Sequence, residues 1–207
     1  MKVLLVNGSP HDKGCTHESL MHIADALAAD GIESEEFHIG RAPISGCIAC
    51  NACGKLGRCA INDVVNEFAA KAAEADGFVF GSPVYYASAN GSLISFMDRL
   101  FYSAPSEIFA HKPAACVVNA RRGGNTAAFD QLNKYLTITQ MPVVSSCYWN
   151  MTHGNSAEQH AQDAEGIRTM RLIGHNMAWL LKCIEAGRAA GVGEPVTEPV
   201  AWTNFIR

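Results

Sequence analysis

The chain has 207 residues, enough for one domain with an elaboration, and its composition of 48% hydrophobic and 17% charged residues supports a packed core. Its formal net charge of -4, without a long run of Lys or Arg, excludes the basic surface that is typical of nucleic-acid-binding proteins. No apolar stretch approaches about 20 residues and the start "MKVLLVNGSP" lacks the features of a signal peptide, so we expect a cytoplasmic protein without a membrane span.

Short apolar segments alternate with helical patterns along the chain. Strands are predicted at 2–7, 32–39, 77–83, 114–120 and 141–149. Helical spacing of apolar residues predicts helices at 18–29, 64–75, 91–103, 126–136 and 170–184. This alternation predicts βαβ units, and five strands predict a flavodoxin-like, doubly wound parallel sheet of the α/β class with helices on both faces.

We interpret residues 1–207 as a single domain with two additions to this sheet. One is a Cys-rich insert at 46–62, and the other is a C-terminal helix and tail at 164–207. A doubly wound sheet binds its ligand beyond the carboxyl ends of its strands, at the switch in strand order. The loops after the first, third and fourth strands are therefore the expected site of chemistry.

The loop after the first predicted strand, "NGSPHDKGCTHESL", has the features of an anion site. It is rich in Gly, Ser and Thr and leads into a helix, so backbone N–H groups and the hydroxyls of Ser9 and Thr16 could hold a phosphate. It matches neither a Walker loop nor the GxGxxG dinucleotide fingerprint. A plain turn followed by a helix cap explains the same residues.

Two further loops are predicted at the same sheet edge. In "GSPVYYASANGSL", a proline followed by two tyrosines supplies a flat aromatic wall for a planar ring. In "NARRGGNT", the glycines let backbone amides approach a ligand, and Arg121 and Arg122 could face an anionic ring or a nicotinamide cofactor's phosphate. Surface turns, tyrosines packed on a partner subunit and solvated arginines are the alternatives for each loop alone. Three such loops at one edge favour a common ligand.

In this order, "NGSPHDKGCTHESL", the Cys-rich insert, "GSPVYYASANGSLISFMDRL" and the ending "TNFIR" resemble the NADPH-dependent FMN reductase family of flavodoxin-like proteins. The insert is similar to that of the iron–sulfur flavoprotein branch. The resemblance covers most of the chain and implies FMN as cofactor and NAD(P)H as co-substrate. The flavin would carry the hydride chemistry, so no side-chain nucleophile is expected.

The resemblance also implies which residues contact FMN. The first loop would hold the phosphate, the second would pack on the isoalloxazine ring, and the third would reach the polar edge of the ring. The cofactor-binding residues expected on this basis are Ser9, His11, Cys15, Thr16, Pro83, Val84, Tyr85, Tyr86, Asn90, Asn119, Arg121, Gly123 and Gly124. His11 and Cys15 stand where the family often has Arg and Asn, and protonation of His11 would make FMN affinity pH-dependent.

Four of the eight cysteines, Cys47, Cys50, Cys53 and Cys59, fall within "CIACNACGKLGRC" with C-x2-C-x2-C-x5-C spacing. The first three follow the rhythm of bacterial ferredoxins, so we predict that the four thiolates hold a [4Fe–4S] cluster. Zinc sites more often use two separated CxxC pairs, and disulfides are rare in a reducing cytosol. Thiols that merely pack, or that meet a partner subunit, are the remaining alternative.

We expect this cysteine site between the second strand and a helix beginning near Asp63, a candidate N-cap. This position is at the ligand-binding edge, close to the flavin of the same chain or to one across a dimer interface. The cysteines at 116, 147 and 183 are expected to be buried apolar residues instead.

Three classes of function remain open. The first is an FMN-dependent NAD(P)H oxidoreductase that passes electrons to a flavin, a quinone or another small acceptor. The second is an iron–sulfur flavoprotein that exchanges electrons with a ferredoxin-like partner, and the third is a cofactor-free binding protein on the same fold. The tyrosines, the insert and the tail ending "AWTNFIR" exceed a minimal sheet, which predicts a homodimer or homotetramer with the flavin near the interface. Neither a nucleic acid nor a membrane is an expected partner.

Overall fold

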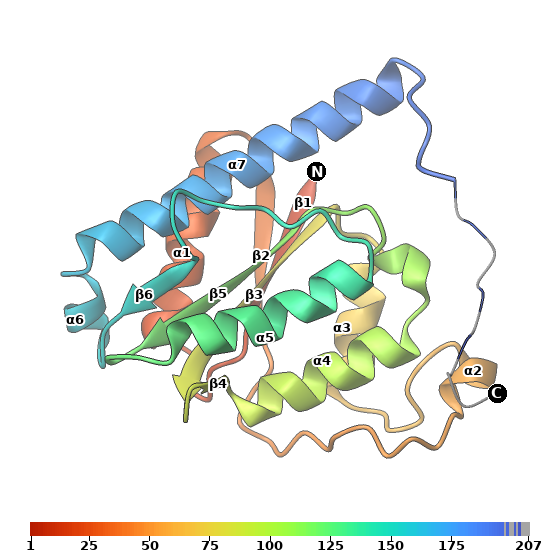
Figure 1. Ribbon diagram of the computed structural model, residues 1–207, viewed down its shortest axis with the longest axis horizontal. Coiled ribbons are helices and arrows are strands. Elements are labelled where there is room, and N and C mark those ends of the chain that lie inside the picture. The colour runs from red at the N-terminus through yellow and green to blue at the C-terminus, as the bar shows by residue number, and fades with distance from the viewer. Residues whose placement is uncertain (197, 199–200, 202, 204–207) are drawn as a thin grey trace.

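A computed structural model describes residues 1–196, 198, 201 and 203. Its centre is a parallel sheet of β1 (Lys2–Asn7), β2 (Glu33–His38), β3 (Gly77–Tyr85), β5 (Ala114–Ala120) and β6 (Met151–His153). The strand order is β2-β1-β3-β5-β6, with the reversal between β1 and β3 that defines the flavodoxin-like switch point. A short strand, β4 (Ser88–Ala89), pairs antiparallel with the end of β3. The predicted fold class is confirmed (Figure 1).

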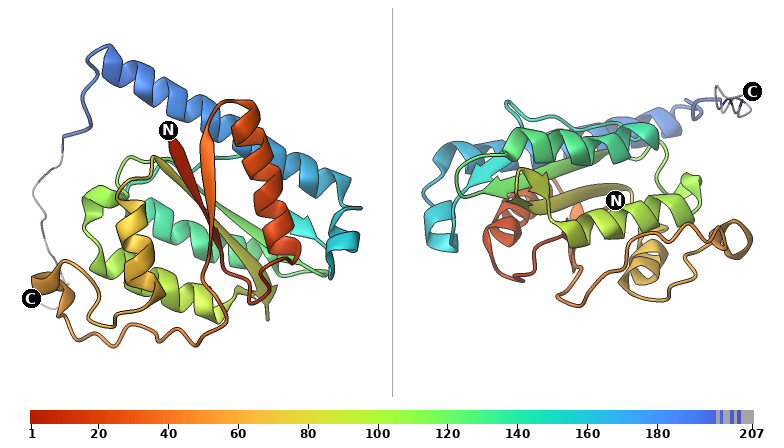
Figure 2. Two further views of the ribbon diagram at one scale, coloured as in Figure 1. Left: turned by 180° about the vertical axis from the view of Figure 1, so that it is seen from behind. Right: turned by 60° about the horizontal axis from the view of Figure 1, so that its bottom comes forward.

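Helices cover both faces of the sheet. The first face carries α1 (Cys15–Ala29) and α7 (Ala164–Ala189), which cross each other in the left view of Figure 2. The opposite face carries α3 (Val64–Ala72), α4 (Gly91–Ser103) and α5 (Asn125–Ile138). Side chains alternate between these two cores along β1, as the pleat of a strand requires. Shorter elements are α2 (Cys53–Leu56), α6 (Ala157–His160) and a 3-10 turn at Ser106–Ile108.

Several element boundaries follow local sequence signals. The Asp63 carboxylate accepts a hydrogen bond from the Val65 amide, so the predicted N-cap of α3 is confirmed. Gly31, two residues beyond the end of α1, has a φ of 77°, a conformation that glycine adopts without strain. The charged strand β2 lies at the edge of the sheet. Among the described residues, no helix is both long and apolar enough to cross a bilayer.

The prediction of a fifth strand at 141–149 is wrong. Val143 forms a single parallel bridge with Ala114, whereas the strand that pairs with β5 is Met151–His153. Between them the chain turns, because the Ser146 hydroxyl binds the carbonyl of Tyr148 and competes with sheet hydrogen bonding. The aromatic and β-branched residues of this segment have high strand propensity, although its two aromatic side chains are exposed.

The prediction that Cys147 and Cys183 are buried is also wrong, because Cys147 is exposed in this turn and Cys183 is exposed on α7. Cys116 is buried as predicted.

Gly174 allows α7 to approach α1 closely. A Cβ at this position would come within 2.6 Å of the Ala26 Cβ and 2.7 Å of the Ile23 carbonyl oxygen. Gly174→Ala is expected to lower the free energy of unfolding by about 1–2 kcal/mol, because overpacking outweighs the higher helix propensity of alanine. Gly187→Ala in the same helix is the control, because its Cβ would meet nothing nearer than 3.8 Å. The free energy of unfolding of that variant, measured by urea denaturation, should be about 0.5–1 kcal/mol higher than that of the wild-type protein. Equal midpoints for the two variants would contradict this account.

Candidate functional site

An open cleft of about 570 Å³ lies beyond the carboxyl ends of the parallel strands. It occupies the edge where β4, β6 and α6 gather, at the left of Figure 1. Its size falls within the usual range for small-molecule sites. The predicted residues that line it are Ser9, His11, Cys15, Thr16, Pro83, Val84, Tyr85, Asn119 and Arg121.

The first loop is held in place from below by Asn7, a fully buried residue at the end of β1. Its side-chain oxygen accepts from the Ser9 amide at 3.0 Å, and its amide nitrogen donates to the Asp12 carbonyl at 3.3 Å. The same nitrogen donates to Glu36 at 2.9 Å, and His38 Nε2 donates to the Ser9 carbonyl at 2.7 Å. These hydrogen bonds from side chains of β1 and β2 therefore set the conformation of the loop.

The start of α1 faces this cleft with backbone N–H groups that no side chain caps. Gly14 precedes the helix and no side chain caps it, so the backbone N–H groups of the first turn are available to an anion. Ser9 and Thr16 are buried beside them, and Cys15 is half-buried. Burial raises the pKa of the Cys15 thiol, so this group faces the cleft uncharged at neutral pH. The arrangement suits a phosphate.

The second loop is a tight hairpin between β3 and β4. Tyr86 and Ala87 form its two-residue turn with φ values of 51° and 59°, a conformation that usually requires Asn or Gly. Pro83, Val84 and Tyr85 line the cleft, whereas Tyr86 projects fully into solvent at the tip. Rigid apolar groups thus form one wall of the cleft, and a second aromatic ring stands outside it.

Three other predicted residues, Asn90, Gly123 and Gly124, do not line the cleft. Asn90 is buried, where it accepts from the Ser92 amide at the start of α4 and donates to the Gly8 carbonyl at 3.0 Å. Gly124 has a φ of 91°, and a Cβ there would lie 2.7 Å from the Ala87 Cα, so the third loop packs directly on the hairpin. Gly123 faces open space, since a Cβ there would meet no described residue within 4 Å.

Sequence reasoning missed one wall of the cleft, the segment 154–158 after β6. Because the fifth strand is predicted at 141–149, the turn that follows the true strand falls outside the predicted loops. The signal is present as "HGNS", in which Gly154 has a φ of 151° and Ser156 caps α6. Like the other loops of the site, this segment follows the carboxyl end of a parallel strand.

A chain of buried hydrogen bonds joins three of these loops behind the cleft. Asn119 Nδ2 donates to the Thr152 hydroxyl at 3.0 Å, which lies 2.9 Å from the Ser19 hydroxyl. The Ser19 hydroxyl also lies 2.9 Å from the Cys15 carbonyl oxygen and 3.0 Å from His160 Nε2. This network fixes the positions of the first loop, the third loop and the segment 154–158 relative to one another.

His160 should make stability pH-dependent. Burial, reinforced by the nearby His22, lowers its pKa in the folded protein. The unfolded state therefore binds more protons below about pH 6.5, and the contribution of neutral His160 to stability is lost as the pH falls from there through the folded pKa. His160→Gln, which keeps a donor for Ser19, should flatten the decline in the free energy of unfolding between about pH 7 and pH 5. Identical slopes for the variant and the wild-type protein would refute this role.

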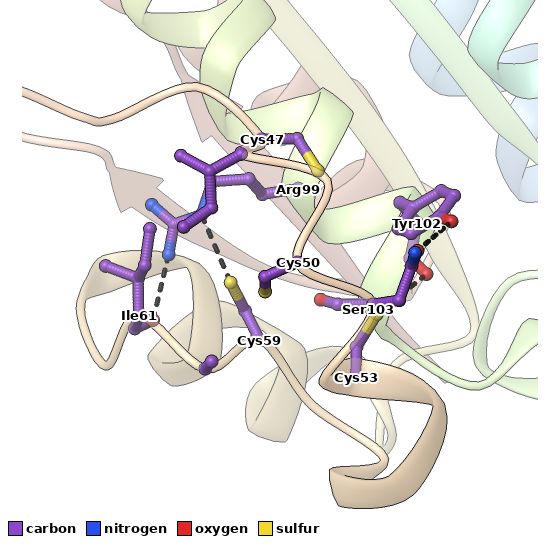
Figure 3. A pocket seen from close by; sticks show the side chains of 11 residues that line it. Cys47, Cys50, Cys53, Cys59, Ile61, Arg99, Tyr102 and Ser103 are labelled. Carbon is purple, nitrogen blue, oxygen red and sulfur yellow. Dashed lines mark hydrogen bonds between the residues drawn. The ribbon is translucent and has the colours of Figure 1, made fainter.

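The four clustered cysteines line a second, much smaller cavity (Figure 3). It lies between the insert and the C-terminal half of α4, and its other lining residues are Ile48, Asn51, Ala60, Ile61, Arg99, Tyr102 and Ser103. The opposite, N-terminal end of α4, a helix of 13 residues and therefore about 20 Å long, lies near the first loop of the cleft, because its N-cap Asn90 donates to the Gly8 carbonyl. The expectation that the cysteines lie at the ligand-binding edge, close to the flavin site of the same chain, is therefore wrong. The extended segment after β2 carries the insert along α4 and away from that edge.

The donor set of this cavity fits an iron–sulfur cluster better than a single ion. Among the described residues, no three His, Cys, Asp or Glu side chains are placed to share one metal ion. Ligands of one zinc ion must all lie about 2.3 Å from it, whereas in a four-iron cluster each thiolate binds a separate iron. Four thiols around one cavity, with a cationic side chain beside them, are suited to a four-iron cluster.

Residues 1–156 match the family model described as NADPH-dependent FMN reductase. An iron–sulfur flavoprotein of Methanocaldococcus jannaschii is 32% identical to the chain over 195 residues, covering 89% of this chain and 100% of the relative. An iron–sulfur flavoprotein of Methanosarcina thermophila is 27% identical, covering 91% of this chain and 99% of the relative. Among solved structures, an NAD(P)H:quinone oxidoreductase from Methanothermobacter marburgensis aligns with a TM-score of 0.66 at 16% identity, covering 86% of this chain and 96% of that one. At that identity the structural likeness shows the fold alone.

Proposed function

Because the chain belongs to the NADPH-dependent FMN reductase family, we propose that it is an FMN-dependent oxidoreductase that takes electrons from NAD(P)H. Its acceptor would be a flavin, a quinone or another small molecule. The observation that carries the proposal is the cleft, in which an uncapped helix N-terminus faces a rigid apolar wall across a space of ligand size.

We place the FMN phosphate at the start of α1, where the first-turn N–H groups and the hydroxyls of Ser9 and Thr16 would bind it. The ring system would pack on Pro83, Val84 and Tyr85, which are held by the hairpin. Bound FMN supplies the chemistry of accepting a hydride from a nicotinamide and passing electrons onward.

The protein's own contribution is orientation and charge. Asn119 is positioned by its hydrogen bond to Thr152, and Arg121 stands beside it in the cleft wall. A guanidinium in that position would favour negative charge at the polar edge of the ring. The segment 154–158 would form the opposite wall of the cofactor site.

The proposal is tested by adding FMN to the purified, flavin-free chain and then titrating it anaerobically with NADH and with NADPH. We expect one FMN per chain and bleaching of its visible bands by at least one of the nucleotides. The two titrations also show which nucleotide is preferred. Failure to bind FMN, or a bound flavin that neither nucleotide reduces, would overturn the proposal.

A second candidate function is electron transfer through FMN and an iron–sulfur cluster to a ferredoxin-like partner. Two observations favour it: the four cysteines line one cavity, and several relatives carry the name iron–sulfur flavoprotein. Cys47, Cys50, Cys53 and Cys59 would be the ligands of a [4Fe–4S] cluster. We also propose a cytoplasmic location, where such thiols stay reduced.

We further propose that the chain forms a homodimer or homotetramer. Tyr86 is fully exposed at the hairpin tip beside the cleft, and Tyr148 and Trp149 are half-exposed in the turn before β6. Exposed aromatic side chains of this kind are typical of interfaces between subunits. The tail, which the sequence also favours as part of the interface, includes residues 197, 199–200, 202 and 204–207, which lie outside the described residues. Light scattering at micromolar concentration should give twice or four times the chain mass, and a monomer mass would refute the assembly.

A further inference from the structure

Arg99 is a cation buried beside the cysteine cavity, with only 1% of its surface exposed. All five of its N–H donors are used. One terminal nitrogen donates to Asp63 at 2.7 Å and to the Ser45 carbonyl at 3.3 Å, and the other donates to Asp63 at 2.9 Å and to the Ile61 carbonyl at 2.8 Å. The fifth donor, Nε, points at the Cys59 sulfur at 3.3 Å (Figure 3). The guanidinium thus ties the two ends of the insert to α4.

The pair formed with Asp63 is ionised at neutral pH. Burial would raise the pKa of the Asp63 carboxyl, but hydrogen bonds from Arg99 and from the Val65 amide hold it below its ordinary range. The ion pair and the two carbonyl contacts join Arg99 to both ends of the insert. The contact with Cys59 is the one that reaches a cysteine of the cavity.

We propose that Arg99 is a positioning residue for the iron–sulfur cluster, donating a hydrogen bond to the Cys59 thiolate and raising the cluster's reduction potential. This inference rests on the second candidate function above. Hydrogen bonds to the sulfur ligands and the charge near the cluster are two of the properties by which a protein sets its reduction potential. Arg99 supplies both from one side chain.

The sign of the effect follows from charge. In the assay each cluster gains one electron from dithionite, with no bond or proton transferred, so the cluster with its four thiolates becomes more negative. A buried cation in contact with one of the sulfurs stabilises the reduced state more than the oxidised state. The carboxylate of Asp63 opposes this effect, but Arg99 and not Asp63 contacts the sulfur. Loss of the N–H···S contact should therefore lower the potential.

The test uses the full chain reconstituted with iron and sulfide, and it compares cluster potentials by anaerobic dithionite titration followed by visible absorption. The main variant is Arg99→Met with Asp63→Asn, which removes both members of the ion pair together and keeps a capping side chain on α3. Asp63→Asn alone removes only the opposing charge. Arg58→Met is the matched control, since Arg58 precedes Cys59 in the sequence but is exposed and donates to Asn62.

We expect the double variant to bind as much iron as wild type but to be about tenfold harder to reduce, a shift of about 59 mV to more negative potential. Asp63→Asn should shift the potential in the opposite direction, and it keeps the inference testable if the double variant does not fold. Arg99→Lys, which keeps the charge, should lie closer to wild type, and Arg58→Met should equal wild type. Clusters that form normally with unchanged potentials in the double variant and in Asp63→Asn would overturn the role of Arg99. Failure of the wild-type chain to take up iron would instead overturn the cluster proposal on which it rests.

Discussion

Thr16→Ala is expected to weaken FMN binding about tenfold to a hundredfold. The Thr16 side chain is buried in the first turn of α1 and lines the cleft beside the uncapped N–H groups. A hydrogen bond to a charged group contributes about 1.5–3 kcal/mol, and each 1.4 kcal/mol is tenfold in affinity. The dissociation constant can be measured from the quenching of FMN fluorescence on binding.

Thr16→Ser is the matched control for this prediction. The Thr16 methyl group packs near Gly81, since a Cβ at Gly81 would lie 2.9 Å from it. Alanine therefore removes both a hydroxyl and a packing contact, whereas serine removes only the methyl group. If the hydroxyl binds phosphate, the serine variant retains most of the affinity. Equal weakening in both variants, or none in either, would contradict the placement of the phosphate.

Cys50→Ala with Cys53→Ala is expected to abolish iron uptake. Anaerobic reconstitution of the wild-type chain with iron and sulfide should give about four irons per chain, and the double variant should give close to none. FMN affinity should not change, because the cysteine cavity lies at the C-terminal end of α4 and shares no lining residue with the cleft. Iron and labile sulfide are measured together with the visible spectrum.

The control for this loss is Cys147→Ala with Cys183→Ala, which also removes two thiols, both exposed and outside the cavity. That variant should take up as much iron as wild type. No iron uptake by the wild-type chain, combined with intact NAD(P)H oxidation, would leave a flavin reductase whose clustered cysteines are structural. Equal iron loss in both double variants would show that uptake does not depend on the cavity.

Most strands and helices were predictable, because each element carries its own periodicity. The alternating cores on the two sides of β1 and the apolar spacing of α1 and α4 follow directly from residue order. The failure at 141–149 has a local cause. The Ser146 hydroxyl captures a backbone carbonyl there, and neither β-propensity nor hydrophobicity registers that competition. Because the fifth strand is predicted at 141–149, the segment 154–158 is not predicted as a wall of the cleft.

The sequence by itself determined the fold class, three of the four loops at the cleft and the grouping of the cysteines, because these depend on local patterns and on the rule that parallel strands share a carboxyl edge. Only the tertiary structure decided which loop residues line the cleft and which support it, as with Asn90 and Gly124. It also decided that the cysteine insert runs along α4 to the far end of that helix. That path depends on Arg99, whose partners Ser45 and Asp63 are 54 and 36 residues away in the chain. Contacts over such separations arise from packing in three dimensions, so no local pattern could have indicated them.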